Sequence, residues 1–114
     1  MPYYSTRSIT LVSSSARTAN GVSSAYSVAD IIEGRVYISI TATSGSGAPT
    51  LTVIVQDSDD GGTTWYTHTA SSGLTATGQT PLNLTNFGKT IRISWTITGT
   101  SPSFTFSVVM VGKG

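Results

Sequence analysis

The sequence has no cysteine, a single histidine and few charges, and each shortage excludes a class of function. Without cysteine there is no disulfide framework and no thiolate chemistry, and His68 alone cannot build an imidazole zinc site. Charged residues make up 10% of the 114 residues and the net charge is +1. A charge this weak provides no basic face for nucleic acid. We therefore expect no metal, no cofactor and no nucleic-acid partner.

Long apolar runs are also missing. The first ten residues, MPYYSTRSIT, lack the apolar core of a signal peptide. No run approaches the roughly 18 apolar residues that span a bilayer. The sequence predicts no membrane association. It also predicts that the protein is made in a cytoplasm and leaves the cell only through lysis or as part of a particle.

What the chain does contain is Ser, Thr, Gly and alternating apolar residues. Ser and Thr account for 38 of the 114 residues, and such a composition favours strands and tight turns. Apolar residues alternate with polar ones in four segments, which is the pattern of half-buried strands. These segments are residues 35–43, 50–56, 89–98 and 103–111. Weaker candidates lie at 7–12 and 25–29, and a short strand is expected at 81–84. We expect about eight short strands in the whole chain.

These strands predict an all-β fold with almost no helix. About eight short strands separated by turn signals are typical of an antiparallel β-sandwich, and the strand count favours a jelly-roll over an immunoglobulin-like topology. SGSGAP (44–49) and GTSP (99–102) are expected to be hairpin loops that each join two strands. We divide the chain into an N-terminal arm, residues 1–25, and a sandwich domain, residues 26–114.

Two roles are open for the arm. It has adjacent tyrosines, then an alternating stretch in which Ile9 and Leu11 share one face, then a Ser/Ala/Thr tract. The segment could form the first strand of the sandwich. It could equally add as a strand to a sheet edge of a neighbouring subunit through main-chain hydrogen bonds.

The densest polar cluster is QDSDDGGTTW, residues 56–65. It matches the pattern S-x-D-x-G-x-T-W and so resembles the Asp-box, a hairpin motif of sialidases and many unrelated β proteins. In families that carry this motif the box is generally structural, and that resemblance implies a turn rather than a catalytic site. The implied turn residues are Ser58, Asp60, Gly62, Thr64 and Trp65.

The same acids are also candidates for chemical roles. A glycosidase needs two carboxyl groups from separate elements facing across a cleft, whereas Asp57, Asp59 and Asp60 share one short turn. A calcium loop of the EF-hand type lacks its later bidentate Glu here, although incidental calcium binding stays open. A Ser-His-Asp triad cannot be excluded by counting, but no nucleophile motif surrounds any serine. We expect no enzyme activity and no catalytic residue.

The class of function that remains is binding through a contact surface. Val109 and Val111 fall on the strand face opposite Val108 and Met110, so both faces of that strand are apolar, and Ile54 interrupts a polar outer face in the same way. An oligomer would cover these side chains, and the alternative is that they lie under a loop. With the arm they give the candidate partner contacts: Tyr3, Tyr4, Arg7, Ile9, Leu11, Val109 and Val111.

Residues 34–113, with the phrases QDSDDGGTTW and WTITGTSPSFTF, resemble small structural proteins of tailed bacteriophages and prophages. The resemblance implies a decoration or cement protein that is often trimeric on the capsid surface, with the major capsid protein as its partner. It implies a virion location after assembly in the host cytoplasm. Two alternatives are a tail or fibre domain and a carbohydrate-binding module. The latter would stack sugars on Tyr3, Tyr4, Tyr26, Tyr37 and Trp65.

Overall fold

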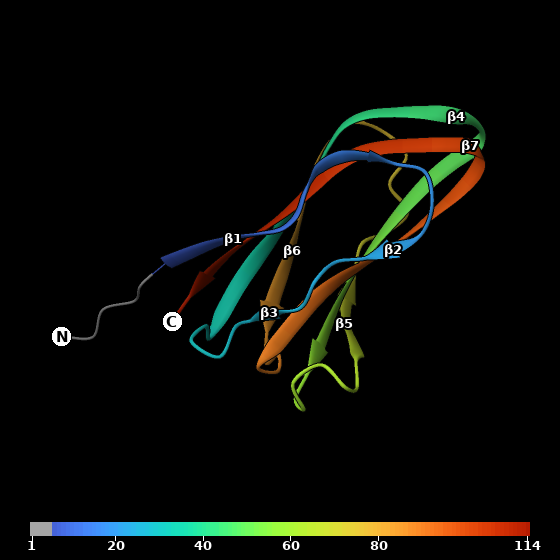
Figure 1. Ribbon diagram of the computed structural model, residues 1–114. Helices are drawn as coiled ribbons and strands as arrows, with labels where there is room; N and C mark the ends of the chain where they lie inside the picture. Colours follow the sequence, from blue (N-terminus) through green and yellow to red (C-terminus); the bar gives the residue numbers. More distant parts are fainter. Residues whose placement is uncertain (1–5) are drawn as a thin grey trace.

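The computed structural model describes residues 6–114 as an all-β protein (Figure 1). Within this range no helix is long and apolar enough to cross a membrane. The strands are β1 Thr6–Arg17, β2 Gly21–Val22, β3 Tyr26–Ser27, β4 Glu33–Ser58, β5 Tyr66–Ala70, β6 Gly78–Thr85 and β7 Thr90–Lys113. Two strands, β4 and β7, are much longer than the other five.

The fold is organised by one antiparallel ribbon of β4 and β7. The pairing starts at Glu33 opposite Lys113 and continues to Ser58 opposite Thr90. The ribbon bends sharply partway along and runs back (Figure 1). We call residues 33–44 with 103–113 the first arm of the ribbon, and residues 50–58 with 90–98 its second arm. Neither is the N-terminal arm, residues 1–25. The first arm carries β1 on one side and β6 on the other, and the second carries β2 and β3 on one side and β5 on the other.

The predicted hairpin loops at 44–49 and 99–102 are wrong. These two segments lie opposite each other in the β4–β7 pairing, so both strands bend together and neither reverses. The register shifts on both sides of Ser46, which marks β-bulges, and bulges bend a strand pair. The turn-type residues supply the backbone angles of this corner, because Gly45, Gly99 and even Ala48 have positive φ.

Strand alternation places one apolar face of each arm inside. The inward positions are even-numbered on β4 in the first arm and odd-numbered in the second, because the bulges at the corner change the alternation. Both arms contribute to one hydrophobic core. Trp95 of the second arm meets Phe106 of the first in an edge-to-face contact, with ring centroids 5.6 Å apart.

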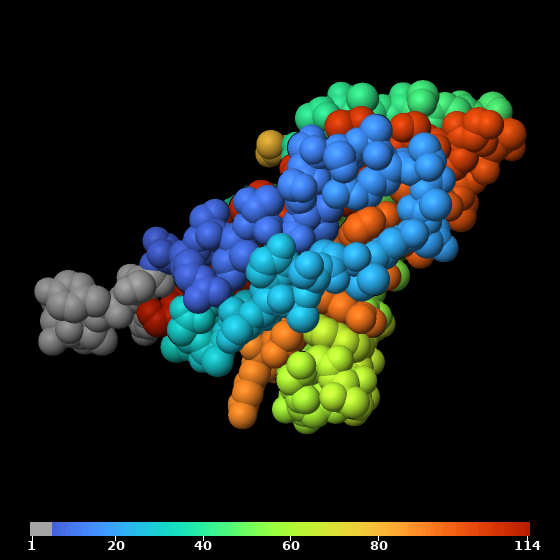
Figure 2. All heavy atoms as spheres, in the orientation of Figure 1, coloured from blue at the N-terminus to red at the C-terminus, as the bar shows by residue number. Residues whose placement is uncertain are grey.

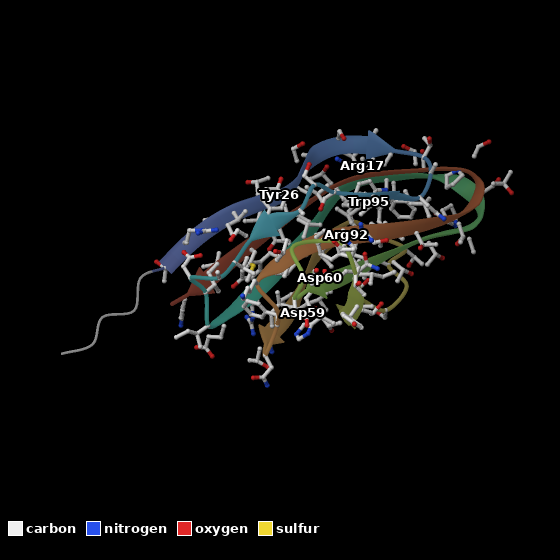
Figure 3. All side chains as sticks on the ribbon, turned by 60° about the horizontal axis from the view of Figure 1, so that its bottom comes forward. Arg17, Tyr26, Asp59, Asp60, Arg92 and Trp95 are labelled. Atoms are coloured by element: carbon white, nitrogen blue, oxygen red, sulfur yellow. The ribbon has the colours of Figure 1, made fainter. Side chains whose placement is uncertain are left out.

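Arg17, at the end of β1, covers the core where the two arms meet (Figure 3). Its guanidinium lies 5.0 Å from the centre of the Trp95 ring system and 4.9 Å from that of Phe106. It also donates hydrogen bonds to the carbonyls of Ser13, Ser15 and Phe106. Burial lowers the pKa of Arg17. The side chain thus fastens β1 to the first arm.

The described part of the N-terminal arm forms a strand in the sheet of its own chain. Residues 6–17 form β1 and pair antiparallel with β7 of the same chain, from Thr6 opposite Lys113 to Arg17 opposite Phe104. In Figure 2, β1 lies along one side of the body, and residues 18–32 run beside it. The division at residue 25 stays a prediction.

The predicted all-β antiparallel class is confirmed. The strands form a single sheet of seven strands whose main path is β1-β7-β4-β5, and this sheet is open. A two-sheet sandwich and a jelly-roll are finer classifications that stay predictions.

We predict that the Gly99→Ala variant is destabilised by about 1–3 kcal/mol, the usual cost of a residue held in a disfavoured backbone region. Gly99 has a φ of 124°, and a Cβ there would lie 2.9 Å from the Cα of Pro49. Urea denaturation measures the change. The control is Thr100→Ala, an exposed neighbour in the same corner. Equal midpoints for the two variants would show that the corner does not depend on Gly99.

Candidate interaction surface and acidic turn

The acidic cluster is a closed hydrogen-bonded turn between β4 and β5. The Ser58 hydroxyl donates to Asp60 Oδ1 (2.7 Å) and accepts from the Gly62 amide (2.9 Å). Asp60 Oδ1 also accepts from the backbone amides of Thr63 (3.1 Å) and Thr64 (2.9 Å). Gly61 and Gly62 both have positive φ, as the turn requires. The structure therefore brings the predicted turn residues together around the Asp60 carboxylate.

These bonds make Asp60 a strong acid. Hydrogen bonds from the Thr64 amide and the Ser58 hydroxyl favour the ionised form and lower its pKa far below the ordinary value of 3.8. The Asp60 carboxylate is therefore ionised near neutral pH and accepts these hydrogen bonds there. It is therefore a poor proton donor or base for catalysis near neutrality.

Trp65 closes the turn on its other side. Its indole nitrogen donates to the Gly62 carbonyl (3.0 Å), and the Arg92 guanidinium lies 4.3 Å from the ring centre. Arg92 also donates to Gln56 Oε1 (2.7 Å), across the second arm. Trp65 is thus held by its own turn and by β7, and the yellow-green turn region protrudes from the body in Figure 2.

Asp57 and His68 both contact the 86–89 loop, but each has a different partner there. Asp57 accepts from the Gly88 amide (2.8 Å) and anchors the 86–89 loop, whereas Asp59 is exposed. His68 packs edge-on against Phe87. Within residues 6–114, no group of three or more His, Asp or Glu side chains is placed to hold a metal.

The outer face of the first arm carries the apolar positions noted in the sequence. Val109 and Val111 of β7 point away from the core and are half-buried. Their register partners on β4 are Tyr37 and Arg35. Tyr37 is 38% exposed, and the Arg35 guanidinium lies 6.0 Å from its ring centre. We call Tyr37, Val109 and Val111, together with the charged residues Glu33, Arg35 and Lys113 beside them, the outer patch.

The outer patch is hollowed at its end. A depression of about 280 Å³ lies over β4 and β7, and charges of both signs stand beside its apolar floor. Glu33 and Lys113 are exposed register partners there, yet in the described part of the chain the one ion pair joins Arg7 to Asp30. The lining residues are Glu33, Gly34, Arg35, Tyr37, Val111 and Lys113.

The predicted partner contacts on β1 differ in burial and in their bonding partners. Leu11 is 2% exposed and belongs to the core, so its prediction as a partner contact is wrong. Ile9 packs partly against the core. Arg7 is held by Asp30 at 2.7 Å and by the Ser27 carbonyl at 2.9 Å. Tyr3 and Tyr4 lie outside the described residues.

Sequence reasoning missed the charged rim of the outer patch. Lys113 is far from Glu33 and Arg35 in the sequence, and only the β4–β7 register brings it to their end of the sheet. The sequence did carry a signal, because Arg35 and Tyr37 alternate with buried Val36 and Ile38 and so had to face outward.

Three of the aromatic residues expected of a carbohydrate-binding module lie in the described part of the chain, and these three do not form one row. Tyr26 packs against the core, Tyr37 lies on the outer face of the first arm, and Trp65 has Arg92 on its ring.

Comparison with known proteins gives likeness of fold alone. No protein-family model matches the chain, and no curated protein matches it. Among solved structures, the SPBc2 prophage-derived protein YomS superposes with a TM-score of 0.62 at 11% identity, over 100% of this chain and 97% of that one. A chain in the structure of infectious bursal disease virus, Gx strain, gives a TM-score of 0.55 at 14% identity, over 98% of this chain and 32% of that one.

The Asp60→Asn variant should have a lower urea midpoint than the wild type at pH 7. Because folding depresses the pKa of Asp60, its ionised form stabilises the folded state above about pH 4. That stabilisation is lost as the pH falls toward the folded-state pKa. The gap between wild type and variant should therefore narrow at pH 2–3.

Asp59→Asn is the matched control, because this neighbouring carboxylate is exposed and should change the midpoint little. If both variants unfold at the wild-type midpoint at pH 7, the carboxylate of Asp60 does not hold the turn.

Proposed function

We propose that this chain is a non-enzymatic structural protein of a tailed-phage virion, which binds the outside of the capsid and stabilises it by bridging capsid subunits. The observation that carries the proposal is the outer patch, where Val109, Val111 and Tyr37 give a rigid sheet face an apolar surface that one copy leaves partly exposed. Such surfaces on small proteins mark contact sites.

The state of the acids supports a structural role. Asp60 and Asp57 accept hydrogen bonds from backbone amides. A reactive carboxylate needs a different setting, with a raised pKa or a partner across a cleft. The acidic turn is therefore proposed to act as an Asp-box-like structural corner.

The likeness in fold to a prophage-derived protein and to a chain of a virus structure agrees with this setting. The finer architecture proposed is a sandwich of jelly-roll type, made when the bent ribbon closes its two arms over one core. The partners are the major capsid protein and further copies of this chain, and the trimer implied by the phage resemblance is the starting expectation. Neither nucleic acid nor a membrane is a partner.

The mechanism is mechanical. A bent ribbon whose two arms share one packed core resists deformation, so a contact made at one end of the molecule is transmitted to the other. Many modest contacts repeated over a shell combine through avidity, because each oligomer holds several capsid subunits at once. Bridging in this way stabilises the shell against the pressure of packaged DNA.

The test uses expanded capsids, of the phage or prophage that encodes the chain, which lack this protein. The wild-type protein should co-sediment with them and raise the temperature at which they disrupt. The Asp59→Asn variant should do both equally well, because that acid has no chemical task. Absence of co-sedimentation, or an unchanged disruption temperature, contradicts the proposal.

A further inference from the structure

The outer patch has a chemical composition that selects one kind of occupant. Its centre is apolar, with Val109, Val111 and Tyr37, and its end carries Glu33 beside Lys113. The third charge of the rim, Arg35, already donates to Asn83 Oδ1 at 2.9 Å. An apolar centre with a polar rim is the usual anatomy of a protein–protein contact. A rim with both signs is not steered toward a strongly acidic or strongly basic partner. It is complementary to a surface that carries the same two charges in exchanged positions.

A second copy of this chain is such a surface. We infer that two copies pack face to face through the outer patch, related by a twofold axis that runs parallel to the strands between β4 and β7. The inference rests on the homo-oligomer of the proposed function and names its contact. It replaces the implied trimer by a pair.

The β4–β7 register defines what this axis brings together. Rotation about it exchanges β4 and β7 and leaves the position along the strands unchanged. Each β4 residue then lies over the residue that is its register partner within one copy. Glu33 faces Lys113 of the second copy, and Tyr37 faces Val109 of the second copy. Both contacts occur twice, as in any isologous interface.

The electrostatics favour this pairing. Glu33 and Lys113 are exposed at the ends of their strands, and the described residues hold no ion pair between them. In the pair each charge gains an opposite partner at a contact from which the neighbouring apolar floor excludes water. The flanking outward residues Ser39 and Ser107 are small, which allows the two sheets to approach to the usual spacing of about 10 Å.

The test is a charge exchange read by molar mass. In sedimentation equilibrium the wild-type protein should have twice the 11.8 kDa chain mass. Glu33→Lys alone should place two like charges at both contacts and give a monomer, and so should Lys113→Glu. An equimolar mixture of the two variants should restore the pair, because both contacts then join opposite charges.

The matched control is Lys89→Glu, a charge reversal at an exposed loop position outside the patch, which should stay paired. All variants should keep the wild-type circular dichroism, since each altered side chain is exposed. A wild-type monomer or trimer overturns the inference, as does a single charge reversal that leaves the mass unchanged or a mixture that stays monomeric.

This experiment contains no capsid, so its result is separate from that of the capsid assay. A monomer that still co-sediments with capsids would sink the twofold contact and leave the proposed function intact. A protein that forms the pair but does not co-sediment with capsids would support the twofold contact and contradict the proposed function.

Discussion

The continuous antiparallel pairing of β4 with β7 is the constraint on which the rest of the molecule depends. Every other strand pairs with one of these two, and the core lies between the arms that they form together. A ribbon of this length cannot bury an apolar face while it stays straight, since both faces would meet water. The paired bend brings the two apolar faces together, so that Trp95 packs against Phe106. The Arg17 guanidinium lies over both rings.

The same geometry explains why one outer face retains apolar residues. In a strand, successive side chains point to opposite sides, so the outward row of the first arm is fixed once Phe106, Val108 and Met110 are buried. That row contains Val109 and Val111, which a monomer gains little by exposing. The contrast with the acidic turn is sharp. There the Ser58 hydroxyl and Asp60 Oδ1 already have hydrogen-bond partners, whereas the apolar row of the first arm is left partly exposed.

Much of this could be predicted from the sequence, and the limits are physical. Alternation located the inward faces of β4 and β7, and turn chemistry identified Ser58, Asp60 and Gly62 because all their bonds are local. The corner was misassigned because Gly45 and Gly99 signal a change of direction without saying whether one strand reverses or two bend together. That depends on pairing between residues more than 50 positions apart in sequence. Leu11 was misplaced for a related reason. Its burial depends on the pairing of β1 with β7, and the Glu33–Lys113 rim is equally a product of long-range register.

The central claim is that this molecule works by contact, as a fixed part of a particle. Electron cryomicroscopy of virions of the proposed source phage tests it most directly. The account predicts density with the bent two-armed outline on the outside of the capsid, seated between neighbouring capsid subunits. Virions that contain no such density on the head, or that carry it only at the tail, would contradict it.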